Sequence, residues 1–134
     1  MIDFNEYFND SYERISANSE VFFDEFYLNF IKKSDELDKM FAGVSLERQK
    51  MMLKKGIFYL ISFYSTKQAS DYLVKLAALH QNDLKIRDSL YEIWVDSMLE
   101  TVEKLDPKYS REVEMGWRIT MSPGIEFMKY YSEE

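Results

Sequence analysis

Cysteine is absent from this sequence, and glycine, proline and histidine are scarce, with four, two and one residues among 134. Without cysteine the chain can form no disulfide, no thiolate metal site and no thiol nucleophile, and such a composition suits a reducing compartment. A chain of this length forms one domain around one hydrophobic core. We therefore expect a single domain over residues 1–134, located in the cytoplasm.

Long apolar runs and basic clusters are also missing. The longest mostly apolar stretch, residues 56–64, is far shorter than the roughly 20 residues that cross a bilayer. The acidic N-terminus does not resemble a signal peptide. Acidic residues outnumber basic ones by 24 to 17, which gives a net charge of −7, and no basic cluster is longer than two residues. We expect no membrane span and no nucleic-acid partner.

Apolar residues recur at helical spacing through the chain, whereas sustained β-strand alternation is absent. The apolar stripes predict helices over residues 4–15, 23–31, 45–64, 70–80, 91–105 and 110–128, with a short helix ending near Phe41. Ser19, Ser34 and Ser45 are the predicted N-caps. Gly43 predicts a corner, and Pro123-Gly124 predicts a kink in the last helix. The sequence therefore predicts an all-α fold.

His80 is the only histidine, and it ends an apolar stripe that contains Leu73, Leu76 and Ala77. By itself, a histidine on an apolar face is more often a hydrogen-bonded core residue than a metal ligand. Zinc normally takes three or four His, Cys or carboxylate ligands, and no acidic residue shares this face, so a zinc site is not expected. A single protein ligand is instead the pattern of haem iron bound by a proximal histidine.

A longer pattern surrounds this histidine. The segments 26–31 (FYLNFI) and 35–41 (DELDKMF), followed by Gln49, Leu53 and His80, together resemble bacterial single-domain globins. The resemblance extends to the globin domain of flavohaemoglobins and to globins coupled to signalling domains, and it covers almost the whole chain. It implies the globin fold, a three-on-three helical sandwich around haem, with haem b as the cofactor.

The same resemblance implies roles for individual residues. His80 corresponds to the proximal iron ligand, and Phe41 corresponds to the phenylalanine that packs on the haem. Tyr27 and Gln49 correspond to the hydrogen-bonding residues above the iron, with Leu53 as the apolar wall beside them. Singly, Tyr27, Phe41 and Leu53 could be ordinary core residues, and Gln49 could lie on the surface. Their joint order with His80 favours a haem pocket.

Tyr91 resembles the tyrosine that, in flavohaemoglobins, lies near the proximal imidazole and acts with a glutamate from the last helix. Here the spacing from His80 is one residue longer, and none of the glutamates near the end of the chain (Glu126, Glu133 and Glu134) is well placed, so we do not expect a proximal triad. The further candidates for the haem wall are Leu76, Ile86, Trp94, Val95 and Met98. Arg48, Lys85 and Arg87 are candidates for binding the haem propionates, although solvated surface charges explain them equally well.

Three classes of function remain open. The first is reversible binding of O2, and of NO or CO, at a five-coordinate haem iron, either for storage or, with a separate reductase, for NO dioxygenation. The sequence has no Gly-rich flavin or nucleotide motif, so any catalytic role would depend on a separate reductase, which makes an enzyme less expected than a gas-binding protein. The second is gas sensing with a signalling partner. The third is a haem-free helical interaction module, against which the combination of His80, Tyr27 and Gln49 argues.

Overall fold

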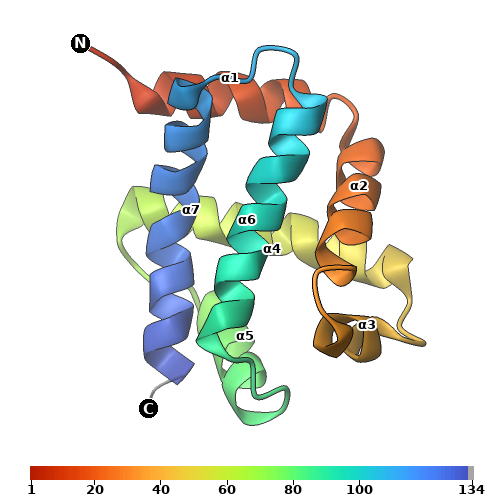
Figure 1. Ribbon diagram of the computed structural model, residues 1–134. Coiled ribbons are helices and arrows are strands. Elements are labelled where there is room, and N and C mark those ends of the chain that lie inside the picture. The colour runs from red at the N-terminus through yellow and green to blue at the C-terminus, as the bar shows by residue number, and fades with distance from the viewer. Residues whose placement is uncertain (133–134) are drawn as a thin grey trace.

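The computed structural model describes residues 1–132, and helix is the only regular secondary structure within that range (Figure 1). The prediction of an all-α chain is therefore confirmed, and the predicted segments agree with the helices to within a few residues. The helices are α1 (Phe4–Ser16), α2 (Ser19–Ile31), α3 (Asp35–Phe41), α4 (Leu46–Thr66), α5 (Asp71–Asn82), α6 (Asp88–Leu105) and α7 (Arg111–Ser132).

Serine side chains fix where four of the helices begin. Ser34, Ser45, Ser70 and Ser110 each accept a hydrogen bond from the main-chain N–H three residues later, at the starts of α3, α4, α5 and α7. The predicted caps Ser34 and Ser45 are confirmed, but the prediction that Ser19 caps α2 is wrong. Ser19 is already helical, and Asn18, with φ of −139° and ψ of 60°, takes the N-cap position. Asparagine is also a favoured N-cap residue.

The six helices other than the short α3 pack as two layers of three. α7 contacts α1, α4 and α5, whereas α6 contacts α2 and α7. Figure 1 shows α6 and α7 running side by side across α4, with α1 at one end of the molecule and α3 and α5 toward the other. Gly43, with φ of 76°, makes the predicted corner between α3 and α4, in a backbone region that favours glycine. Pro123 lies inside α7.

None of the helices in the described part of the chain combines the length and the apolar character that a membrane span needs.

A buried polar network joins α1 to the end of α6 and to α7. The carboxylate of Asp106 is 2.6 Å from the Ser11 hydroxyl that donates to it, and it is 2.7 and 2.9 Å from two nitrogens of Arg14. The indole N–H of Trp117 donates to the Ser11 hydroxyl at 2.9 Å. Because each of these polar groups has a partner, the charge of Asp106 can be buried. The network fixes α1 against the α6–α7 connection.

Gly116 allows α7 to cross α1 at close range. A Cβ atom at this position would lie 2.8 Å from the main-chain oxygen of Phe4 and 3.1 Å from the main-chain nitrogen of Phe8. Both atoms belong to the α1 backbone, so a side-chain rotation cannot relieve the contact.

Gly116→Ala is therefore expected to lower the free energy of unfolding by about 1 to 3 kcal/mol, the range for overpacking, even though alanine favours helix more than glycine does. Gly56→Ala is the matched control, because this residue is also inside a helix and its Cβ would meet nothing within 4 Å. The control should keep or raise the stability. Urea denaturation measures both variants, and equal midpoints would contradict the close crossing.

Candidate functional site

A cavity of about 300 Å³ lies among the helices, and every helix except α1 contributes to its lining. Most of the lining side chains are apolar. Polar side-chain atoms come from Tyr27, Gln49, His80 and Tyr91 and from the indole of Trp94. A largely apolar cavity with a few polar groups is the usual form of a small-molecule site.

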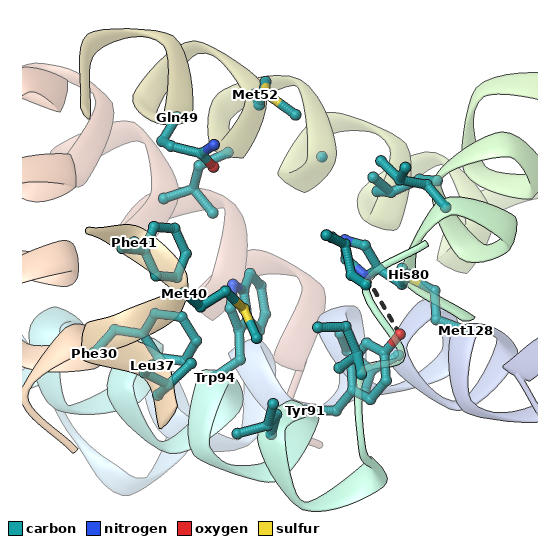
Figure 2. Close-up of a pocket in the computed structure, with 18 of the residues that line it drawn as sticks. Phe30, Leu37, Met40, Phe41, Gln49, Met52, His80, Tyr91, Trp94 and Met128 are labelled. Atoms are coloured by element: carbon teal, nitrogen blue, oxygen red, sulfur yellow. Dashed lines mark hydrogen bonds between the residues drawn. The ribbon is translucent and has the colours of Figure 1, made fainter. Parts of the chain in front are cut away.

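His80 lies near the end of α5 and extends into this cavity (Figure 2). Its Nδ1 atom is 3.3 Å from the hydroxyl oxygen of Tyr91. Burial lowers the pKa of His80 to about 4, so the imidazole is neutral at neutral pH. A neutral imidazole is the form that binds metals, and with Nδ1 at the tyrosine, Nε2 is the nitrogen left for another partner.

Tyr91 is brought next to the imidazole by the first turn of α6. Burial, with a smaller contribution from the charge of Asp88, raises the pKa of Tyr91 to about 12, so its hydroxyl stays protonated. Among the described residues, no carboxylate is hydrogen-bonded to His80 or to Tyr91. Glu126 instead pairs with Lys129 on α7, and Glu133 and Glu134 lie outside the described residues.

Tyr27, Phe41, Gln49 and Leu53 form the other wall. Figure 2 shows Gln49 and Phe41 across the cavity from His80. Tyr27 is 6% exposed, and its hydroxyl donates a hydrogen bond to the main-chain carbonyl of Gln49 at 3.1 Å. Burial raises the pKa of Tyr27, which keeps the hydroxyl protonated. The side chain of Gln49, which also lines the cavity, is the second polar group on this wall.

Nine of the eleven residues that the sequence predicts for the haem pocket line this one cavity. The other two, Val95 and Met98, lie half-buried and buried on α6, and neither is among the lining residues. Consecutive helical residues point about 100° apart, so Val95 faces another direction than Trp94, which does line the cavity. The nine are Tyr27, Phe41, Gln49, Leu53, Leu76, His80, Ile86, Tyr91 and Trp94.

The sequence analysis did not name the remaining lining residues as part of the site. Several of them had a usable signal: Ile57 and Leu60 continue the face of α4 that carries Gln49 and Leu53. An apolar stripe, however, does not tell which part faces a cavity and which part faces another helix. The residues missed are Phe30, Leu37, Met40, Val44, Met52, Gly56, Ile57, Leu60, Leu79, Leu84, Leu90, Ile125 and Met128.

The three predicted cationic residues are exposed and do not line the cavity. Arg87 forms an ion pair with Glu36 on α3, which agrees with its alternative interpretation as a surface charge. Within residues 1–132, no group of three or more His, Cys, Asp or Glu side chains is arranged to hold a metal ion. Any metal held in the cavity by His80 would therefore need most of its ligands from another molecule.

A comparison with solved structures agrees with this architecture, whereas no protein-family model and no curated protein match the chain. Among solved structures, the chain superposes with a TM-score of 0.87 on a protein from Pseudomonas aeruginosa that is described as structurally highly homologous to human haemoglobin. The two sequences are 32% identical, and the match covers 96% of this chain and 98% of the other.

This match confirms the predicted globin fold, whereas the resemblance to flavohaemoglobins stays a prediction. A three-on-three helical architecture, a cavity between its layers and an identity of 32% over 96% of the chain lead to the same conclusion: the chain belongs to the globin-like family that includes this Pseudomonas protein.

Proposed function

We propose that this protein is a single-domain, haem-binding globin that reversibly binds O2, and also NO and CO, in the cavity between His80 and the wall that carries Tyr27 and Gln49. One observation carries the proposal: a single neutral imidazole faces an apolar cavity across from two polar side chains. The fold supports it, because the globin fold generally binds haem.

The residues present fit a flat apolar group that brings its own equatorial ligands. Phe30, Phe41 and Trp94 offer ring surfaces to such a group, and His80 offers one axial nitrogen. Because the chain has no cysteine, covalent attachment of the c-type is excluded, which favours haem b. When bound, haem supplies an iron that a proximal histidine holds and that keeps one position open for a gas.

On the proximal side, His80 would hold the iron through Nε2, and Tyr91 would fix the orientation of the ring through Nδ1. A carboxylate partner would make the imidazole a stronger electron donor to the iron. The described residues supply only the neutral hydroxyl of Tyr91, at 3.3 Å. This partner favours reversible gas binding over peroxidase-like chemistry.

On the other wall, Tyr27 and Gln49 would interact with the gas. O2 bound to a haem protein carries partial negative charge, so an O–H or amide N–H donor directed at it contributes about 1 to 3 kcal/mol in a dry pocket. The hydroxyl of Tyr27 has one proton, and the main-chain carbonyl of Gln49 accepts it at 3.1 Å. Donation to O2 therefore competes with this internal hydrogen bond.

The biological use of the gas depends on partners. Oxygen storage needs none, NO dioxygenation needs a separate reductase, and gas sensing needs a signalling partner. The net charge of −7 disfavours nucleic acid as that partner. A haem-free interaction module is disfavoured because it gives the neutral imidazole in the cavity no role.

Haemin titration tests the proposal. The protein is expected to take up one haemin, and His80→Ala should weaken the uptake by more than about tenfold, since even the loss of an outer partner of a metal ligand costs about 10- to 100-fold. Added imidazole should restore it. Lys75→Ala, an exposed position on the same helix, is the control. A wild-type protein that takes up no haemin, or an unaffected His80→Ala variant, would contradict the proposal.

Tyr27→Phe tests the gas-facing wall. Loss of a donor worth about 1 to 3 kcal/mol should make O2 leave the reduced, haem-loaded protein roughly 5- to 150-fold faster, as stopped-flow spectroscopy would measure. Tyr64→Phe is the matched control, because the Tyr64 hydroxyl is bonded to Asn5 and lies outside the cavity lining. An unchanged O2 dissociation rate in Tyr27→Phe would exclude Tyr27 as a donor to the gas.

A further inference from the structure

Lys50 is buried although it carries a charge. Its side chain is 8% exposed, and its Nζ atom lies 2.7 Å from Glu47, 2.9 Å from Asp24 and 3.0 Å from Glu20. Hydrogen bonds with Glu47, Asp24 and Glu20 raise the pKa of Lys50. Lysine is almost never buried unless it is paired. We call these four residues the ion cluster.

The ion cluster joins the same two helices as the hydrogen bond from Tyr27 to Gln49. Lys50 directly follows Gln49 on α4, whereas Glu20 and Asp24 lie on the face of α2 that continues, three residues later, to Tyr27. The position of the Gln49 carbonyl relative to the Tyr27 hydroxyl therefore depends on how firmly the ion cluster holds α4 against α2.

Apolar packing does not fill this contact between α2 and α4. A second cavity of about 180 Å³ lies there, and its lining includes Lys50, Asp24, Leu28, Leu46 and the same Tyr27 that lines the first cavity. The ring of Tyr27 packs against Phe26 and Phe41, with ring centroids 5.2 and 5.7 Å apart, so the unfilled space lies on the other side of Tyr27, beside the ion cluster. Across this space, polar contacts join α2 to α4: the ion pairs of Lys50 with Glu20 and Asp24, and the hydrogen bond from Tyr27 to Gln49.

We infer that Lys50 is a positioning residue that holds the Gln49 carbonyl against the Tyr27 hydroxyl and thereby sets how strongly this carbonyl competes with a bound gas for the single tyrosine proton. The inference rests on the proposed function. In this inference, a charged side chain outside the first cavity controls how fast O2 leaves. Loosening the ion cluster weakens the competing carbonyl bond, so the tyrosine donates more fully to the gas.

Lys50→Met tests this inference because methionine keeps the unbranched chain and removes the charge. O2 should leave the haem-loaded variant about fivefold more slowly, the equivalent of one ordinary hydrogen bond. Lys50→Arg should restore the wild-type rate. Lys104→Met is the matched control, since Lys104 also pairs with α2, through Glu25, but from α6. An O2 dissociation rate in Lys50→Met that is unchanged or faster would overturn the inference.

A double variant tests the path through the tyrosine proton. In a Tyr27→Phe background, Lys50→Met should have no effect, because the proton for which the carbonyl competes is missing. An equal effect in that background would show that Lys50 acts by another path.

A measurement on the haem-free protein separates this inference from the proposed function. The ¹³Cζ NMR signal of Tyr27, assigned with Tyr27→Phe, reports the hydrogen bond of its hydroxyl. Lys50→Met should shift this signal and Lys104→Met should not. A protein that takes up no haemin would refute the proposed function while this signal still tests the link between Lys50 and Tyr27. An unmoved signal in Lys50→Met would refute the link alone.

Discussion

One neutral imidazole in an apolar cavity is the feature on which the rest of this structure depends. Side chains around unfilled volume lose dispersion contacts and lower the stability of the fold, so a ligand that fills the cavity stabilises the folded state. Burial keeps His80 unprotonated, with a pKa of about 4, and Tyr91 occupies Nδ1. The result is one free nitrogen directed at a space with mostly apolar walls.

The helix boundaries place the polar groups around this space. Ser45 starts α4, which puts Gln49 in its first turn, and Ser70 starts α5, whose last turn carries His80. α7 closes the cavity with Ile125 and Met128, and its position depends on the close crossing over α1. Tyr27 belongs to both an ion-paired face and the cavity wall, so charge at the surface and polarity in the cavity are connected through one helix.

Local signals in the sequence predicted much of the fold and of the site, and long-range contacts account for what they missed. Serine caps and apolar periodicity act over a few residues, which is why Ser34 and Ser45 were identified correctly, although Asn18 took the place of Ser19. Periodicity could not tell that Trp94 lines the cavity and Val95 does not, because both residues belong to the same apolar stripe. The carbonyl that accepts from Tyr27 is a main-chain atom, so no side-chain pattern indicates it.

The absorption spectrum of the haem-loaded protein after reduction, before and after addition of CO, tests whether His80 alone holds the haem iron and leaves a site open for a gas. A single histidine ligand and an open position predict the Soret band of a five-coordinate haem, which shifts when CO binds. A reduced spectrum that is already six-coordinate and does not respond to CO would show that a second side chain closes the gas site, and it would contradict the proposed gas binding.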